Sequence, residues 1–206
     1  MRFPSEKFSS VGSYFNAYVD ELARASASVS RDNLIAAEAL LTAALKQDAQ
    51  VFACGNGGSA AISNHLVCDH AKGVQADTSL RPRIRSLSEN VELITAIGND
   101  ISYDKVFAFQ LSTFARPGDV LITISSSGNS ENIVRAIRWA LDNQMATIAM
   151  TGFDGGRSAR LSQVNLHVVS ENYGVIEDLH QSLMHTLAQY IRQSYMSEEL
   201  IKSRKF

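Results

Sequence analysis

Disulfides and cysteine metal pairs are missing from this 206-residue sequence, which contains only two cysteines and three prolines. Cys54 and Cys68 are too few for a disulfide framework and do not form a CxxC metal motif. We interpret both as free thiols, which are typical of a reducing compartment, so we expect a cytoplasmic protein. The amino terminus also lacks the basic and apolar regions of a signal peptide, which agrees with that location.

An excess of charge and a long apolar run are missing as well. The 19 lysines and arginines against 21 acidic residues leave a net charge of -2, which gives no general attraction for nucleic acid or an anionic membrane. No stretch approaches the roughly 20 apolar residues that a membrane-spanning helix needs. We therefore expect no nucleic acid and no membrane as partner, and any anionic ligand must be held by local groups.

What the sequence does contain is enough apolar material for one core. Hydrophobic residues make up 45% of the chain, and a length near 200 favours a single domain, since domains average about 100 to 200 residues. We expect one domain over residues 1–206, with an N-terminal helical segment at 1–48 and an α/β core with a C-terminal helix at 49–206.

Short apolar runs alternate with helical patterns along that core. Apolar residues at spacings of three and four predict helices over 1–24, 33–45 (capped by Ser30), 130–141 and 175–194. The apolar runs predict strands over 51–54, 84–87, 120–124, 147–150 and 165–169. Strands that alternate with helices and are apolar throughout predict an α/β fold, in which helices cover both faces of a parallel sheet.

Two of these strands end in similar corners, VFACGNGGSA over 51–60 and VLITISSSGNS over 120–130. Ligands of open parallel sheets bind beyond the carboxyl ends of the strands, and helix N-termini there attract anions. Serine hydroxyls add donors without adding charge, so the corners predict a phosphate site. The alternative is that Ser59 and Ser130 only cap their helices. The corners lack the P-loop lysine and the GxGxxG spacing, so we expect no nucleotide cofactor.

The corners at 54–59 and 124–130, with AIGND at 96–100, TGFDGG at 151–156 and the terminal helix, resemble the sugar isomerase (SIS) domain family, and within it the phosphoheptose isomerase group. The resemblance covers nearly the whole chain. It implies a flavodoxin-like sheet of five parallel strands flanked by helices. It also implies N-terminal helices that join the helical core of a homotetramer, and a phosphosugar site lined by more than one subunit. The implied reaction, part of heptose biosynthesis, interconverts sedoheptulose 7-phosphate and D-glycero-D-manno-heptose 7-phosphate through an enediol.

Acid and base candidates lie on two helices. His65 and Asp69 are four residues apart and share a helix face, while Glu177 and His185 share a broad face of the last helix. Isomerisation of a ketose needs a base at one carbon and an acid for the oxygens, and a carboxylate with a histidine can supply both. The alternative is structural: Asp69 pairs with Lys72 or His65, and the histidines are ordinary helix side chains.

The resemblance assigns roles to these residues. It makes Asp69 and His185 the catalytic pair, in which either can be the acid or the base. It implies one zinc ion held by His65, Asp69, Glu177 and His185, and zinc is a plausible match for such donors on chemistry alone. The implied substrate-binding residues are Asn56, Gly57, Gly58, Ser59, Asp100, Ser125, Ser126, Ser127, Ser130 and Glu177. Within that set the five serines hold the phosphate, and Asn56 and Asp100 lie near sugar hydroxyls.

Three positions depart from the resembled group, and they keep two alternatives open. Asp69 stands where glutamate is usual, Glu177 where glutamine is usual, and Gly174 where a more polar residue is common. These departures favour an isomerase of another phosphosugar as one alternative. The second is a non-catalytic SIS protein that binds the replication initiator, in which the position of His185 is not histidine. We expect His70, His167 and His180 to be structural.

Overall fold

The computed structural model of the chain describes residues 3–206. Its centre is a sheet of five parallel strands in the order β2-β1-β3-β4-β5. The strands are β1 (Gln50–Gly55), β2 (Arg83–Ser86), β3 (Val120–Ser125), β4 (Ala146–Thr151) and β5 (Val164–His167). All five predicted strands are therefore confirmed, and the order is the flavodoxin-like one. The chain leaves β1 toward β2 on one side and returns to β3 on the other, so the order reverses between β1 and β3.

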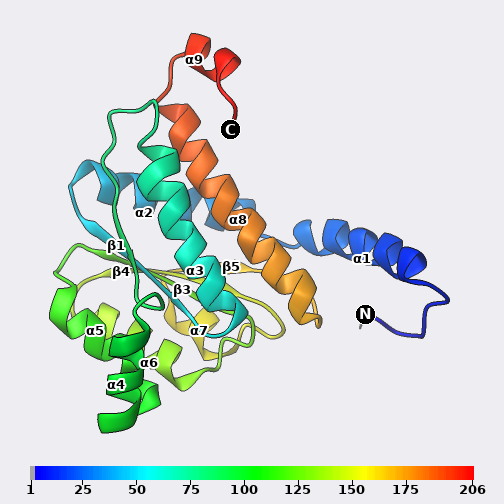
Figure 1. Cartoon of the computed structure of the whole chain (residues 1–206), viewed down its shortest axis with the longest axis horizontal. Helices are drawn as coiled ribbons and strands as arrows, with labels where there is room; N and C mark the ends of the chain where they lie inside the picture. Colours follow the sequence, from blue (N-terminus) through cyan, green and yellow to red (C-terminus); the bar gives the residue numbers. More distant parts are fainter. Residues whose placement is uncertain (1–2) are drawn as a thin grey trace.

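Helices cover both faces of this sheet (Figure 1). One core joins Val51 and Ala53 of β1 to α2 (Arg31–Lys46), α3 (Gly58–Cys68) and α8 (Tyr173–Ser194). The second joins Phe52 and Cys54 to α4 (Val91–Asp100), α5 (Val106–Phe114) and α6 (Glu131–Asp142). Successive side chains of a strand point to opposite faces, so the apolar runs feed both cores at once. The remaining elements are the π-turn η1 (Asp69–Val74) that extends α3, the 3-10 turn η2 (Tyr103–Lys105), α7 (Gly156–Leu161) and α9 (Glu198–Ser203).

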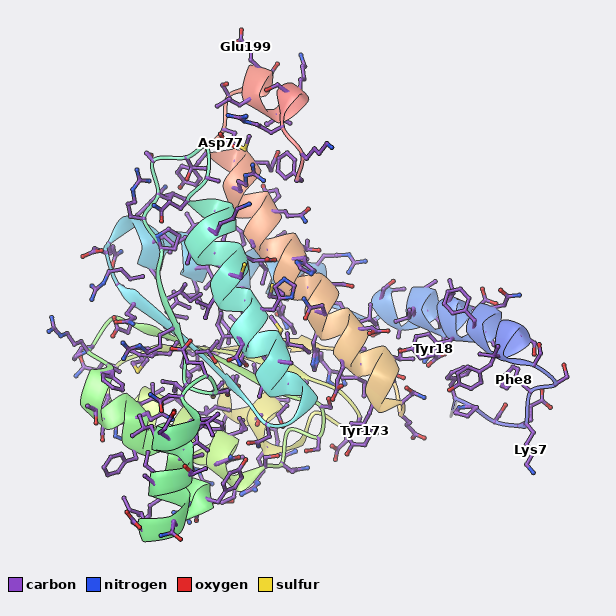
Figure 2. The ribbon with its side chains drawn as sticks, viewed as in Figure 1. Lys7, Phe8, Tyr18, Asp77, Tyr173 and Glu199 are labelled. Atoms are coloured by element: carbon purple, nitrogen blue, oxygen red, sulfur yellow. The ribbon has the colours of Figure 1, made fainter. Side chains whose placement is uncertain are left out.

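The first helix, α1 (Val11–Ser26), projects away from the sheet, as Figure 1 shows. It begins later than the predicted 1–24 because Ser10 caps it, accepting from the Ser13 backbone nitrogen at 3.1 Å. Figure 2 shows Tyr18 near the start of α8, where its hydroxyl donates to Asp178 Oδ2 at 2.7 Å. Val11 and Phe15 are 86% and 63% exposed, so the outer face of α1 has no partner within residues 3–206.

The helices α3 and α8 run side by side in the same direction (Figure 1). At one end Glu177 of α8 lies over Gly58 of α3, and farther along His185 lies against Asp69, which follows α3. Both helices start near the carboxyl ends of the strands. Successive residues along them therefore lie farther and farther from that edge of the sheet. No helix in residues 3–206 combines the length and the apolarity needed to cross a bilayer.

Candidate functional site

The two serine-bearing corners meet at the point where the strand order reverses. β1 ends at Gly55 and β3 at Ser125, and the strands are neighbours, with Gly55 opposite Ile124. Between the corners lies a pocket of about 190 Å³. It is lined by Asn56, Ser59, Ile124, Ser125, Ser126, Ser127, Ser130, Tyr173 and Glu177. The structure thus brings together all five predicted serines with Asn56 and Glu177.

The hydroxyls of this pocket are not used as helix caps. Ser59 lies inside α3, whose cap residue is Gly57, and Ser130 occupies the cap position of α6 without a capping hydrogen bond. The capping alternative is therefore wrong for Ser59, whereas Ser130 does occupy the cap position but leaves its hydroxyl without a capping hydrogen bond. Ser126 is 5% exposed, and its Oγ has no hydrogen-bond partner among the described residues. A buried hydroxyl without a partner is costly unless a ligand or water satisfies it.

The lining contains no lysine or arginine among the described residues. An anion there would be held by hydroxyls, by free backbone N–H groups and by the positive ends of α3 and α6, which both begin at the pocket. The Glu177 carboxylate opposes the attraction of these groups for an anion. Burial, and then the neighbouring Asp178 carboxylate, raises the pKa of Glu177 above its ordinary value.

Asn56 is fixed by residues that sequence reasoning missed. Its amide makes a reciprocal pair with Asn132 of α6, with N–O distances of 2.8 and 2.9 Å, and its Oδ1 also accepts from the Tyr103 hydroxyl at 2.9 Å. Tyr173 in the pocket lining was missed as well. The one available signal was Asn132, a polar residue beside the buried Ile133 and Val134 on the apolar face of α6.

The loop after β3 requires glycine at position 128. Gly128 has a φ of 63°, and a Cβ built there would lie 2.7 Å from the Gly155 carbonyl carbon. The Gly128 carbonyl accepts from the backbone nitrogen and the hydroxyl of Ser158, both at 2.9 Å. The close contact with the loop after β4 therefore holds the serine corner in place.

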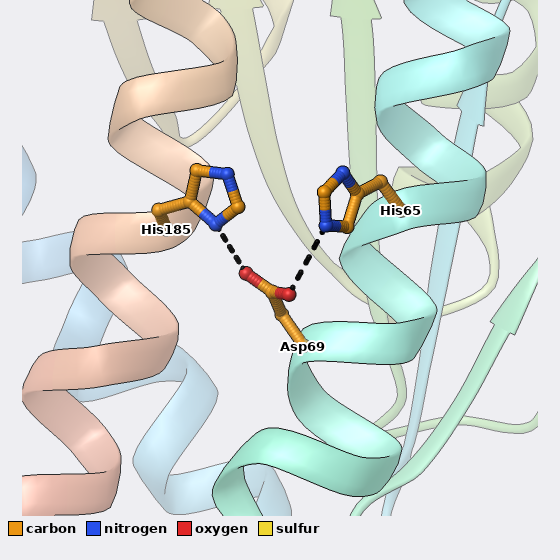
Figure 3. Close-up of side chains that lie close together, drawn as sticks. All are labelled: His65, Asp69 and His185. Atoms are coloured by element: carbon orange, nitrogen blue, oxygen red, sulfur yellow. Dashed lines mark hydrogen bonds and ion pairs between the residues drawn. The ribbon is translucent and has the colours of Figure 1, made fainter. Parts of the chain in front are cut away.

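A second group of polar residues lies farther along α3 and α8 (Figure 3). Asp69 points between the helices, with Oδ2 at 2.5 Å from His185 Nδ1 and Oδ1 at 3.4 Å from His65 Nε2. The two imidazoles lie edge to face, with ring centroids 4.9 Å apart. The predicted shared face of His65 and Asp69 is confirmed. Among residues 3–206 the ion-pair partners of Asp69 are these two histidines.

The side chain of Gln181 completes this group, and sequence reasoning missed it. Its amide nitrogen is 3.0 Å from His65 Nδ1 and 2.9 Å from His185 Nε2. Gln181 is four residues before His185 and therefore shares its helix face. The four-residue spacing of Gln181 and His185 was visible in the sequence. Nothing there indicated that the packing of α3 against α8 would place His65 beside these two residues.

The donor set of this group fits a zinc ion. Ligand atoms of His65, Asp69 and His185 lie within 4.8 Å of one another, and imidazole nitrogens with a carboxylate oxygen are common zinc ligands. A zinc–ligand distance of about 2 Å is compatible with such spacing after the short His185–Asp69 hydrogen bond opens. Among the described residues, neither Cys68 nor Glu177 belongs to this group.

The other predicted residues lie as follows. Glu177 is in the serine pocket, where its Oε2 would be 2.5 Å from a Cβ on Gly58, and it is eight residues, about two helical turns, before His185. Gly57 and Gly58 form the start of α3. Asp100 ends α4 in an exposed position and accepts from the Asn99 amide; the structure does not bring it to the pocket lining described for residues 3–206. A Cβ on Gly174 would lie 2.9 Å from the Tyr18 hydroxyl.

The three remaining histidines are held by intramolecular contacts. His70 and His180 are buried, and each places a ring nitrogen near a backbone carbonyl, that of Leu66 at 3.1 Å and that of Thr151 at 3.2 Å. His167 Nδ1 is 2.9 Å from the Thr151 hydroxyl. Burial lowers the pKa of His180 to about 4, which keeps this ring neutral. These contacts agree with the structural roles predicted for all three.

Comparisons with known proteins agree with this architecture. Residues 13–152 match the family model of the SIS domain. A phosphoheptose isomerase from Alteromonas mediterranea is 38% identical over 75% of this chain and 79% of its own length. One from Aliarcobacter butzleri is 40% identical over 71% of this chain and 77% of its own. The solved phosphoheptose isomerase from Neisseria gonorrhoeae superposes with a TM-score of 0.80 at 32% identity, covering 89% of this chain and 97% of that one. The chain belongs to the SIS domain family, in the phosphoheptose isomerase group.

Proposed function

We propose that this protein is an aldose–ketose isomerase that interconverts sedoheptulose 7-phosphate and D-glycero-D-manno-heptose 7-phosphate. The observation that carries the proposal is the pairing of a serine pocket at the strand ends with the Asp69–His185 group farther along the same two helices. The names of the relatives at 38% and 40% identity supply the seven-carbon substrate.

The phosphate of the substrate binds in the serine pocket. Ser59, Ser125, Ser126, Ser127 and Ser130 donate hydroxyl hydrogen bonds, and the N-termini of α3 and α6 add the positive ends of their dipoles. The unpartnered Ser126 hydroxyl supports this assignment, because a phosphate oxygen would satisfy it. Asn56 lies beside the serines and serves the sugar hydroxyls.

Asp69 and His185 move the proton. One takes the proton from the carbon next to the carbonyl and returns it to the neighbouring carbon, while the other serves the oxygens of the enediol. In the metal-free site, the 2.5 Å contact between Asp69 Oδ2 and His185 Nδ1 orients the imidazole, and the Asp69 carboxyl group remains beside the ring when His185 accepts a proton. Exposures of 19% for Asp69 and 37% for His185 leave both side chains accessible to a substrate.

Zinc is the cofactor that this site favours, with one ion per site. His65, Asp69 and His185 would hold it, and a bound zinc would polarise the carbonyl oxygen of the sugar as a Lewis acid. Glu177 remains a substrate-pocket residue in this proposal, since it lies over Gly58.

The working form is a homotetramer built on the helices, in the cytoplasm. Val11, Phe15, Val19 and Ile35 are large apolar residues exposed on α1 and α2, and Tyr190 is exposed on α8. Large apolar residues exposed on neighbouring helices favour burial of those helix faces against other copies of the chain. Both cysteines are free, which supports a reducing compartment.

A second candidate is the isomerase of another phosphosugar. The specific observation in its favour is the Glu177 carboxylate in the serine pocket, where the resembled enzymes usually have glutamine. A role restricted to binding the replication initiator is disfavoured, because His185 is present and hydrogen-bonded to a carboxylate.

The test is a proton NMR time course of the purified protein with sedoheptulose 7-phosphate, with and without zinc. We expect an aldose anomeric signal from the wild type and none from His185→Ala. Turnover of a pentose or hexose phosphate without turnover of the heptose would establish the second candidate. No turnover of any sugar phosphate would contradict the isomerase.

A further inference from the structure

The amide of Gln181 closes a ring of four polar side chains. Its nitrogen is 3.0 Å from His65 Nδ1 and 2.9 Å from His185 Nε2. The other nitrogen of each imidazole faces Asp69: His65 Nε2 is 3.4 Å from Oδ1, and His185 Nδ1 is 2.5 Å from Oδ2. Each ring nitrogen of the two histidines therefore has one polar neighbour within the group.

With the amide of Gln181 in this orientation, the geometry determines which nitrogen of each ring carries the proton. An amide nitrogen only donates, so His65 Nδ1 and His185 Nε2 must accept from Gln181. A neutral imidazole has one N–H donor and one acceptor nitrogen. The protons are therefore on His65 Nε2 and His185 Nδ1, where both face the Asp69 carboxylate, which only accepts. Three hydrogen bonds and the 3.4 Å contact between His65 Nε2 and Asp69 Oδ1 then close the ring without a cation.

Turning the amide over reverses the pattern. The Gln181 oxygen then accepts from His65 Nδ1–H and His185 Nε2–H, and the lone pairs of His65 Nε2 and His185 Nδ1 face the Asp69 carboxylate. Two lone pairs and a carboxylate directed at one place repel each other unless a cation lies between them, and these residues are the donor set that fits zinc. Each imidazole still carries one proton, so the change is one of tautomer, with no net gain or loss.

We propose that Gln181 is a positioning residue that sets the tautomers of His65 and His185, and that the orientation of its amide selects between a metal-free ring of polar contacts and a divalent-cation site. The inference deepens the proposed function and rests on it for its catalytic meaning, because it decides which nitrogen of His185 carries the proton. Gln181 of α8 thereby joins the site as a residue that contacts both histidines.

The test reads the tautomers directly, by long-range proton–nitrogen NMR of the histidine rings in the full-length protein without sugar. In the metal-free wild type we expect the protons on His185 Nδ1 and His65 Nε2, and we expect zinc chloride to move both to the other nitrogen. Gln181→Leu should lose this preference and bind zinc about 10- to 100-fold more weakly, as is common when a residue that orients metal ligands is lost. Gln193→Leu, on the same helix, is the matched control and should behave as the wild type.

Gln181→Glu gives the opposite perturbation, because a carboxylate only accepts. With zinc bound, it should hold both rings in the zinc-ready tautomers and bind zinc at least as tightly as the wild type, because its carboxylate cannot donate to the ring nitrogens as the metal-free arrangement requires. Unchanged tautomers and zinc affinity in Gln181→Leu would overturn the inference, as would protons on the opposite nitrogens in the metal-free wild type. Because sugar is absent, a protein with the expected tautomer change but without isomerase activity would refute the proposed function alone.

Discussion

We expect single hydroxyl and carboxyl groups to decide how strongly the serine pocket holds an anion. Ser126 offers a buried donor that no described residue uses, whereas Glu177 places a carboxylate in the same lining. The first group would stabilise a bound phosphate and the second would oppose it. Their separate removal should therefore change ligand affinity in opposite directions.

Ser126→Ala should weaken substrate binding without weakening the fold. A hydrogen bond to a charged group contributes about 1.5 to 3 kcal/mol, so KM for the sugar phosphate should rise about tenfold to a hundredfold. The free energy of unfolding should stay level or rise slightly, because the hydroxyl has no protein partner among the described residues. Thr123→Val is the matched control: Thr123 Oγ1 is also buried and unpartnered but lies outside the pocket lining described, so KM should not change. Steady-state kinetics with urea unfolding measures both quantities.

Glu177→Gln should strengthen anion binding at neutral pH. Removing one negative charge near a bound dianion should contribute about 1 kcal/mol or more, which is about fivefold or more in Kd. Sulfate is the suitable probe, because its charge is constant over the relevant range. Calorimetry at pH 7 should show the tighter Kd for the variant.

The pH dependence of the same binding has a definite sign. The pKa of Glu177 is raised above its ordinary value of 4.5, so acidification neutralises this carboxyl before an ordinary glutamate. Wild-type affinity for sulfate should therefore rise as the pH falls from 7 toward 5, while the Gln variant changes less. Equal sulfate affinities of the two proteins at pH 7 would contradict a charged Glu177 in the pocket.

At the scale of secondary structure, the pocket depends on two loops that contact each other. Gly128 after β3 lies against the backbone of Gly155 after β4, so the serine corner is supported from the neighbouring loop. Both glycines have positive φ values, 63° and 78°. A side chain at position 128 would disturb the conformation of its own loop and the contact with the other.

Gly128→Ala should destabilise the protein more than a substitution that only strains the backbone. Gly118 has a φ of 90°, and a Cβ added to it would meet no atom within 4 Å among the described residues, so Gly118→Ala should cost about 1 to 2 kcal/mol from strain alone. Gly128→Ala adds the collision with Gly155 and should cost at least about 1 kcal/mol more. Urea unfolding of both variants makes the comparison, and equal losses would show that the loop contact contributes nothing.

The strands were predictable from sequence because each is a short apolar run bounded by turn residues. β3 is buried along its whole length, and such a strand leaves a clear signal. The helices α4 and α5 were not predicted; α5 reads VFAFQLSTF, which is apolar on most sides and shows no helical period.

The serine pocket was predictable because the carboxyl ends of neighbouring parallel strands meet. The sequence could not predict whether Glu177 or Gln181 contacts His65. That contact depends on the axial offset between α3 and α8, which is set by long-range packing.

At the scale of the whole molecule, the exposed face of α1 leads us to expect assembly with other copies of the chain. Phe15 and Val19 are 63% and 43% exposed on a helix that projects from the body. An isolated helix of this length is marginal in water without packing. The protein should therefore bury this face in an oligomer.

Phe15→Asp should lower the molar mass of the particle while the chain remains folded, since Phe15 contributes little to its own core. Light scattering after gel filtration measures the mass, and circular dichroism reports the helix content. Asn16→Asp adds the same charge at the next, also exposed, position and should leave the mass unchanged. An unaltered mass for Phe15→Asp would show that this face of α1 is not an interface.

The parallel course of α3 and α8 also has a consequence for substrate choice. Glu177 at the serine pocket and His185 beside Asp69 are eight residues apart on one helix, which corresponds to about 12 Å along its axis. A sugar phosphate must bridge this interval to place its phosphate at one end and its reacting carbons at the other. The spacing of the two groups along the helix pair therefore sets a minimum length for the substrate, and we expect a three-carbon sugar phosphate to be too short to reach both.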